Sequence, residues 1–344
     1  MKRINITFMW PGLPDYAARA LGYLRDEIKE DVKVSVIATK PKVPIQGMEL
    51  SFGAKIHWYD QTELFELEEM VTNSDYLFVG GYKNIFSPLL KKCDRNNCSI
   101  VLMSDNNVSN NLVYEKIREL RFKLLHKRNY RMSFVPGTEG INLMKNWGFK
   151  EHEIFSGLYV SDPTVFSSEV PLRKREKSLL YVGQFIERKN VDLLCLAFSE
   201  LVENYPCWKL TLVGSGDLNL EKYRSKNIEI KSFMQPVEIA KLMRVSKAFI
   251  LPSKSEHWGL VVLEAALSGC ALLLSENVGS KSDLCNEFNS AIYKAQKKDI
   301  KVALEGLFNW SDEKYDQAEF WSLENSRKFN PSLFITSVKQ IIKI

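Results

Sequence analysis

The chain has 344 residues, of which 45% are hydrophobic and 26% charged. This composition is typical of a soluble globular protein and excludes a disordered or fibrous one, and the length favours two domains of moderate size. No apolar run approaches the roughly 20 residues needed to cross a bilayer, and Trp10-Pro11-Gly12 ends the N-terminal apolar stretch too early for a signal peptide. We therefore expect a cytoplasmic protein.

In the first half of the chain, apolar runs alternate with helical patterns. Strands are predicted at Ile4–Trp10, Val32–Thr39, Lys55–Tyr59, Tyr76–Val79, Ser99–Ser104 and Met132–Val135. Helices are predicted at Asp15–Lys29, Glu63–Val71, Asn84–Lys92, Val113–His126 and Thr138–Trp147. This alternation is typical of a parallel sheet with helices on both faces, which binds ligands at the carboxyl ends of its strands.

A segment at 162–177 that is rich in Ser, Pro and charge is the predicted linker between two domains. The alternation then resumes. Strands are predicted at Leu179–Val182, Lys209–Val213, Ile228–Phe233, Ala248–Leu251 and Ala271–Leu274, with helices near Val191–Glu203, Val237–Val245 and Leu260–Leu267. After Ile300 the pattern is helical to the end, and the fold class is α/β in both halves without a visible sequence repeat.

The six cysteines give little sign of a metal or disulfide site. Cys93 and Cys98 have the spacing of half a metal site, but no second pair of Cys or His accompanies them. We therefore expect no metal cofactor and no disulfide.

The most informative stretch is Leu251–Ala266, which has the pattern of a buried strand, a tight turn and a helix. Glu256 lies on the turn and Glu264 on the helix. A helix start offers free N–H groups and a partial positive charge, which suit a phosphate. Carboxylates beside it repel phosphate and suit neutral hydroxyl groups instead. A diphosphate with a sugar at both ends satisfies both features, so the stretch indicates a nucleotide sugar.

This stretch resembles the signature of the retaining glycosyltransferases of the GT-B fold, glycosyltransferase family four. That signature is two glutamates separated by seven residues, followed by a small-residue helix and a hydrophobic strand, as in Glu256–Ser275. Two further stretches are similar to the family: Leu179–Asn190 and Leu210–Asp217. The resemblance covers nearly all of the second half of the chain. Over residues 1–165 it is limited to the general pattern of strands and helices.

The resemblance implies two Rossmann-like domains whose parallel sheets face each other across a cleft. Residues 1–165 would form the acceptor domain and residues 166–329 the nucleotide-sugar donor domain. In the family the last helix crosses back onto the first domain, and residues 330–344 are the candidate for it.

The resemblance also assigns roles to the charged residues of the second half. Arg188 and Lys189 would stabilise the negative charge that grows on the departing diphosphate, in place of a metal held by an Asp-x-Asp motif, which the chain lacks. An ordinary solvated pair at a helix start is the alternative, although cations there oppose the helix dipole. Glu256 would contact the transferred sugar, and Glu264 would bind the ribose hydroxyl groups. The alternative for Glu264, taken by itself, is a structural role, because the helix dipole stabilises a glutamate in the first turns of a helix.

The remaining donor-binding candidates are strand-end and turn residues: Gly12, Gly183, Gln184, Gly214, Phe233, Met234, Ser253, His257, Trp258, Gly259, Leu260 and Val261. Many family members have an arginine where this chain has Gln184, and Trp258 could pack beneath the turn rather than contact a ligand. A dinucleotide fingerprint after Gly214 would need a third glycine where the chain has Asn219.

On the acceptor side, Asp105 follows a strand at a place where many relatives have a histidine near the reacting carbon. A catalytic role and a loop or helix-capping role are equally open for this residue. Retaining transfer in the family is thought to proceed by front-face attack, with the leaving phosphate taking the acceptor proton. No enzymic nucleophile is then required.

The net charge of +5 is concentrated in one segment. Of 47 basic and 42 acidic residues, seven basic and two acidic ones lie between Tyr114 and Arg131, so this segment holds the whole excess. A helix over 113–131 with an apolar stripe and cations on both flanks could lie on an anionic membrane surface. We predict such peripheral membrane contact, with a core-facing helix whose cations snorkel as the alternative, and sparse aromatic residues argue against nucleic acid.

We therefore predict a metal-independent hexosyltransferase that moves a hexose from a UDP- or GDP-sugar to a saccharide or a polyprenyl-diphosphate-linked acceptor in surface polysaccharide assembly. A nucleotide-binding dehydrogenase, a non-catalytic binder of sugar nucleotides, and a GT-B epimerase or phosphorylase also fit parts of the pattern.

Overall fold

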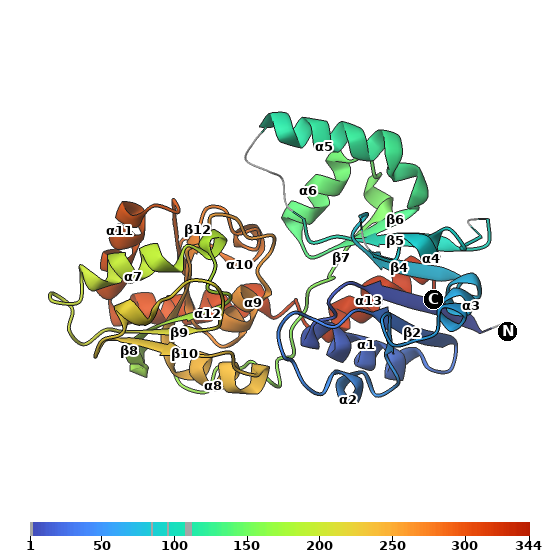
Figure 1. Cartoon of the computed structure of the whole chain (residues 1–344). Coiled ribbons are helices and arrows are strands. Elements are labelled where there is room, and N and C mark those ends of the chain that lie inside the picture. Colours follow the sequence, from blue (N-terminus) through green and yellow to red (C-terminus); the bar gives the residue numbers. More distant parts are fainter. Residues whose placement is uncertain (1–2, 84, 95, 107–111) are drawn as a thin grey trace. The chain divides into compact units, whose positions relative to one another are not determined.

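The computed structural model describes residues 3–83, 85–94, 96–106 and 112–344. The chain forms two compact units, unit 1 with Met1–Val160 and Phe329–Ile344, and unit 2 with Ser161–Lys328. Each unit is built around one parallel sheet that is flanked by helices (Figure 1). The predicted α/β class with two parallel sheets is confirmed, and the units divide at Val160 rather than at the predicted residue 165.

Unit 1 has a seven-stranded sheet in the order β3-β2-β1-β4-β5-β6-β7. The strands are β1 (Ile4–Trp10), β2 (Val32–Ala38), β3 (His57–Trp58), β4 (Tyr76–Gly80), β5 (Ser99–Met103), β6 (Met132–Val135) and β7 (Ile154–Ser156). The helices are α1 (Asp15–Ile28), α2 (Met48–Phe52), α3 (Leu64–Thr72), α4 (Ser87–Leu90), α5 (Leu112–Leu125), α6 (Thr138–Asn146) and, from the end of the chain, α13 (Pro331–Ile342).

The pleat of β1 divides the core of unit 1 between two faces of the sheet. Phe8 belongs to one buried cluster and Met9 to the other, because successive side chains of a strand point to opposite faces. α13 completes the first cluster: the ring of Phe334 lies 6.1 Å from that of Phe8, and Ser337 Oγ donates a 2.6 Å hydrogen bond to the Ser156 carbonyl. The last helix is therefore part of the core of unit 1.

Unit 2 has a six-stranded sheet in the order β10-β9-β8-β11-β12-β13. The strands are β8 (Glu176–Val182), β9 (Lys209–Val213), β10 (Ile228–Lys231), β11 (Ser246–Leu251), β12 (Ala271–Ser275) and β13 (Ser290–Tyr293). The helices are α7 (Val191–Ser199), α8 (Pro236–Val245), α9 (Leu260–Leu267), α10 (Lys281–Leu284), α11 (Lys297–Phe308) and α12 (Asp312–Ser326). All residues of β11 and β12 are buried, as expected for central strands covered on both faces.

The elements that the sequence did not predict are short. α2, β7, α10 and β13 have five, three, four and four residues, and the two strands are largely only partly buried, so none of them has a long apolar run. α4 is shorter than the predicted Asn84–Lys92, and Asn84 lies outside the described residues.

Two features are absent from the described part of the chain. No helix there is both long enough and apolar enough to pass through a membrane, and no group of three or more His, Cys, Asp and Glu side chains is placed to hold a metal ion. None of the six cysteines, all of which are described, is in a disulfide.

Candidate active site at the carboxyl edge of the second sheet

The strand order of unit 2 creates one place where a ligand crevice is expected. From β8 the chain moves outward through β9 and β10, and it then returns to the other side of β8 to form β11, β12 and β13. The connections after β8 and β11 therefore lead away in opposite directions, which leaves a crevice between the carboxyl ends of these neighbouring strands. The segments 183–190 and 252–259 follow these two strands.

A cluster of charged side chains lies at this point. Lys189 Nζ donates a hydrogen bond to Glu256 Oε2, and Arg188 Nη1 lies 3.8 Å from the same oxygen. Ser253 Oγ lies 3.4 Å from it as well. The side chains of Lys189 and Glu256 are only 11% and 13% exposed, whereas that of Arg188 is 44% exposed. The acid and both cations that the sequence assigned to different parts of a donor thus form one group.

Glu256 is held from the opposite side by the loop after β12. Its backbone N–H donates to the Asn277 carbonyl at 3.2 Å, and its carbonyl accepts a bond from the Gly279 N–H at 3.3 Å. These bonds pair Glu256 with Val278 in an isolated parallel β-bridge, which fixes the position of the Glu256 backbone at the edge of the sheet. Sequence reasoning missed Asn277 and Gly279, whose backbone groups make these two bonds.

Asn190 fixes the loop that carries the two cations. It has a left-handed backbone conformation with φ of 61°, which asparagine tolerates better than most residues. Its buried amide donates to the carbonyls of Pro252 and Ala295 at 3.1 and 3.2 Å. The Lys254 N–H also donates to the Arg188 carbonyl at 2.8 Å. The loop after β8 is therefore joined to the loops after β11 and β13.

α9 begins beside this cluster with its first N–H groups unused by the helix. Gly259 precedes it with φ of 84°, and no side chain caps it. The first helical residues, Leu260 and Val261, have N–H groups without an acceptor inside the helix, and Glu264 follows on the same helix, partly buried. Trp258 is buried and its indole N–H donates to Asp283 at 2.9 Å, so its ring supports the turn from below and only its backbone could reach a ligand.

The glycines after β8 and β9 are required by contacts within the protein. A Cβ on Gly214 would overlap the carbonyl oxygen of Gly183, and one on Gly216 would overlap that of Phe185. The two loops are further joined by a 2.8 Å bond from the Phe185 N–H to the Ser215 carbonyl. The Gly-x-Gly pattern is thus explained by loop packing, without a bound dinucleotide.

We expect Gly214→Ala to lower the free energy of unfolding by about 2 kcal/mol or more, because the added methyl group must push two joined loops apart. Gly306→Ala is the matched control: Gly306 is exposed in the last turn of α11, and a Cβ there meets nothing within 4 Å. That change should raise the stability by about 0.5–1 kcal/mol. Urea denaturation of both variants checks the prediction, and equal stabilities would contradict it.

Tyr181 is a polar residue of the site that the sequence did not reveal. Its buried hydroxyl donates a 2.8 Å bond to the Gln184 carbonyl, and a Cβ on Gly183 would lie 2.9 Å from that hydroxyl. Burial and the nearby Glu256 carboxylate raise the pKa of Tyr181 well above its usual value, against the opposing effect of Arg188. The phenol therefore stays neutral and holds the strand end of β8 in place.

The remaining donor-side candidates follow the strands β8, β10 and β11. Gln184 is exposed at the end of β8, and His257 is exposed next to Glu256. Phe233 and Met234 follow β10, two strands away from β8, and are partly buried.

Gly12 and Asp105 belong to unit 1. Gly12 follows β1, has φ of 68°, and its N–H donates to Thr39 Oγ1 at 2.7 Å. Asp105 follows β5 and accepts a 2.7 Å bond from the Tyr159 hydroxyl. Burial, Tyr16 and Asp105 together raise the pKa of Tyr159 well above its usual value, so the phenol remains a donor to this carboxylate.

Unit 1 has a hollow of about 590 Å³ at the same carboxyl edge of its sheet. It is lined largely by apolar residues of the loop after β2 and by Trp58. The Trp58 indole donates to Glu49 at 3.1 Å, and Lys40 Nζ lies 6.0 Å from its ring centre. An aromatic face beside aliphatic side chains can pack against a sugar ring or an acyl chain. No sequence motif pointed to this hollow.

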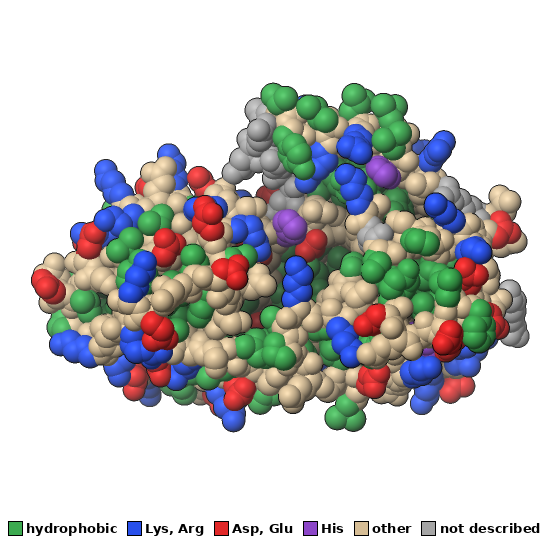
Figure 2. Space-filling view, in the orientation of Figure 1, with side chains coloured by type: hydrophobic (Ala, Val, Ile, Leu, Met, Phe, Trp, Pro, Cys, Tyr) green, Lys and Arg blue, Asp and Glu red, His purple; other side chains and the backbone are tan. Residues whose placement is uncertain are grey.

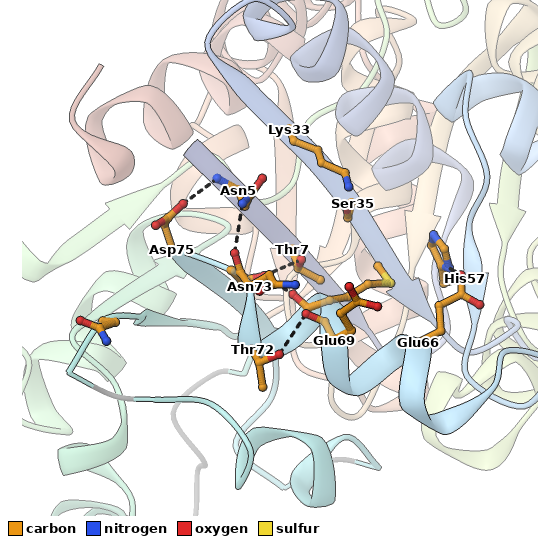
Figure 3. A pocket seen from close by; sticks show the side chains of 13 residues that line it. Asn5, Thr7, Lys33, Ser35, His57, Glu66, Glu69, Thr72, Asn73 and Asp75 are labelled. Atoms are coloured by element: carbon orange, nitrogen blue, oxygen red, sulfur yellow. Dashed lines mark hydrogen bonds and ion pairs between the residues drawn. The ribbon is translucent and has the colours of Figure 1, made fainter. Parts of the chain in front are cut away.

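A larger hollow of about 770 Å³ lies near the amino ends of the unit 1 strands, which is the opposite edge (Figure 3). Its polar groups mostly bind one another: the Asn5 N–H donates to Asp75 at 2.8 Å, and the hydroxyls of Thr7 and Ser74 share a 2.8 Å bond. Its lining therefore offers few unsatisfied groups to a ligand.

Residues 164–322, most of unit 2, match the sequence model of the family described as glycosyl transferases group 1. Three curated relatives are similar to the chain. They are an uncharacterized glycosyltransferase of Haemophilus influenzae (29% identical, 40% of each chain), the alpha-monoglucosyldiacylglycerol synthase of Streptococcus pneumoniae (26%, 42% of this chain and 34% of the relative), and the capsular polysaccharide biosynthesis glycosyltransferase CapH of Staphylococcus aureus (24%, 53% and 54%). The first two matches thus span well under half the length of those relatives.

Solved structures match almost the whole chain. Anabaena Alr3699/HepE in complex with UDP and glucose has a TM-score of 0.75 at 10% identity and covers 99% of this chain and 100% of its own. The lipopolysaccharide outer core galactosyltransferase WaaB has a TM-score of 0.67 at 12% identity, with 99% of both chains covered. The chain therefore has the GT-B fold of these structures, and residues 164–322 are similar to the group 1 glycosyl transferases.

Proposed function

We propose that the protein is a retaining glycosyltransferase that moves a hexose from a UDP- or GDP-sugar to a saccharide or lipid-linked acceptor. The observation that carries this proposal is the cluster at the switch point of unit 2, where Lys189, Arg188 and Glu256 meet close to the start of α9. A cluster of this kind offers cations and helix N–H groups for a diphosphate and a carboxylate for sugar hydroxyl groups.

Departure of a nucleoside diphosphate creates negative charge that the site must stabilise. Two positive side chains and a helix start, already in place before reaction, meet this need because they require no rearrangement as the charge grows. Lys189 is the better oriented of the two cations, since its side chain is nearly buried and already bound to Glu256. On this proposal the enzyme needs no metal ion for the leaving group.

Glu256 then has two tasks. It holds Lys189 before the donor binds, and it accepts hydrogen bonds from hydroxyl groups of the transferred sugar afterwards. Glu264, which follows the turn on α9, would bind the ribose. Retention of configuration through front-face attack would need no further nucleophile, and anomeric analysis of the product by NMR tests it.

The acceptor is proposed to bind unit 1 at its carboxyl edge, where Asp105, Tyr159 and the hollow beside Trp58 lie. The apolar part of that hollow suits a lipid or the flat face of a sugar. The names of relatives, which include an alpha-monoglucosyldiacylglycerol synthase, a capsular polysaccharide biosynthesis glycosyltransferase and a lipopolysaccharide outer core galactosyltransferase, agree with such acceptors. We place the protein in the cytoplasm, in surface glycan assembly, with lipid contact through the segment 113–131.

A thermal-shift screen of the full chain against UDP-, GDP- and ADP-sugars and NAD(H) tests the donor. One nucleotide series should raise the melting temperature of the wild type by about 5 °C or more at a hundredfold excess over Kd, and NAD(H) should not. Stabilisation by NAD(H) alone would instead establish a dehydrogenase.

Two further measurements distinguish a transferase from a binder, an epimerase or a phosphorylase. Release of the nucleoside diphosphate that requires an added acceptor is expected of a transferase. A protein that is stabilised by a nucleotide sugar but never releases its diphosphate is a binder, and conversion of the donor without any acceptor indicates an epimerase or phosphorylase.

A further inference from the structure

α5 presents its apolar side chains to solvent. Val113, Ile117, Leu120 and Leu124 recur at helical spacing and form one stripe along the helix. Their exposed fractions are 71%, 62%, 59% and 67%. We call these four residues the α5 stripe. The alternative prediction from the sequence, in which this stripe faces the protein core, is therefore wrong.

The opposite side of α5 explains this orientation. Phe122 is buried and stacks on Trp147 at the end of α6, with ring centres 4.3 Å apart. The Arg118 guanidinium lies 5.2 Å from the centre of the same indole and bonds to the buried Glu115 at 2.9 Å. Aromatic stacking and a cation–π contact therefore attach the helix to unit 1. The α5 stripe makes no contribution to that attachment.

Basic side chains border the stripe along its length. Lys116 and Lys123 lie on one flank and share Glu119, at 3.0 and 2.7 Å. Arg121 on the other flank and Arg128 in the turn that follows α5 are exposed and have no carboxylate partner among the residues that the structure describes. Figure 2 shows hydrophobic side chains along the outer side of α5 with Lys and Arg side chains beside them. The surface is thus an apolar stripe with a positive border.

We propose that α5 lies flat on an anionic lipid bilayer, with the α5 stripe among the acyl chains and the bordering cations at the lipid phosphates. Fourteen residues are too few to span a bilayer but suffice for a helix in the interface plane. A second copy of the chain is a poor partner for the α5 stripe, because packing two stripes together would bring the bordering cations of both copies close to each other. A membrane supplies both the apolar layer and the negative charge.

Flotation of the full chain with lipid vesicles tests this proposal. The wild type should float with vesicles of phosphatidylcholine and phosphatidylglycerol and hardly at all with phosphatidylcholine alone. Ile117→Ser with Leu124→Ser should lower the partition coefficient at least tenfold, because the stripe loses its apolar side chains. Arg121→Gln with Arg128→Gln should lower it about tenfold or more on the anionic vesicles, since each cation near the surface contributes severalfold.

Val302→Ser with Phe320→Ser is the matched control, because both residues are 59% exposed on helices of unit 2. This variant should float within twofold of the wild type, and circular dichroism should show all variants folded. A wild type that stays unbound to anionic vesicles overturns the proposal, as does a stripe variant that binds like the wild type. Self-association of the wild type that the stripe variant loses would also overturn it, since the stripe would then bind a second copy.

Discussion

Replacing Lys189 with methionine is expected to lower kcat by a factor of about 100–1,000. In the proposed reaction its ammonium group stabilises the departing diphosphate, and the removal of one well-placed donor to a developing anion costs about this much. Glu256→Gln should lower activity comparably, because the amide can no longer hold Lys189 as a charged partner. Turnover of the donor identified in the thermal-shift screen provides the measurement.

The same two variants should also lose stability, and this provides a sharper test. Both side chains are largely buried, so the removal of one charge leaves the other without its partner, at a cost of about 3 kcal/mol. The double variant Lys189→Met with Glu256→Gln removes both charges and should regain most of this loss. Its activity should stay as low as that of the single variants. Recovery of stability without recovery of activity separates catalysis from folding.

Lys254→Met is the matched control for this pair of predictions. Lys254 is also on the loop after β11, but its side chain bonds to the exposed Glu187 at 2.9 Å and is itself 47% exposed. Exposed ion pairs contribute little to stability. We expect Lys254→Met to have the melting temperature and turnover of the wild type. A single-site Lys189 or Glu256 variant that keeps turnover within threefold of the wild type would refute the assigned roles.

The sequence predicted the long strands well because they carry their own signal. β1, β6 and β9 have the predicted bounds, since each is a largely apolar run with most of its side chains buried. β7 and β13 lie at sheet edges, where a three- or four-residue strand is only partly covered and shows no apolar run. Edge strands of this kind depend on the neighbouring strand for their structure.

Within the site, the residue types were predictable but their pairing was not. Lys189 and Glu256 are 67 residues apart, and only the strand order that places β8 beside β11 brings them together. Gly214 is likewise required by a close contact with Gly183, which follows the neighbouring strand β8. Motifs can therefore identify the chemistry of such a site, whereas the strand order decides which groups share it.

The helix at 112–125 shows a different limit. A stripe at helical spacing is the same pattern whether it faces the core or the solvent. Here the choice depends on Phe122 and Trp147, whose stacking turns the stripe outward. Periodicity alone could not have revealed this contact.

Arg175 lies in the segment that the sequence predicts to be a charged linker, yet its side chain has no exposed surface. Its guanidinium donates to the carbonyls of Val170, Met243, Ser246 and Ser268 at 2.7–3.2 Å. Met243 lies in the last turn of α8 and Ser268 caps the end of α9, so the positive charge meets the unpaired carbonyls of two helix ends. Gly269, with φ of 73°, ends α9 and leaves room for the guanidinium.

Arg175→Met is therefore expected to lower the free energy of unfolding of unit 2 by about 3–5 kcal/mol, because several buried carbonyls lose their donor at once. Arg175→Lys should recover only part of this loss, since one ammonium group cannot reach acceptors that lie on opposite sides of a planar fork. Arg173→Met, which removes an ion pair with Asp316 whose side chains are 48% and 45% exposed, should change stability by less than about 1 kcal/mol. Hydrogen exchange of the α9 and β11 amides locates the effect in unit 2, and protection as in the wild type in Arg175→Met would show that water or the backbone replaces the guanidinium.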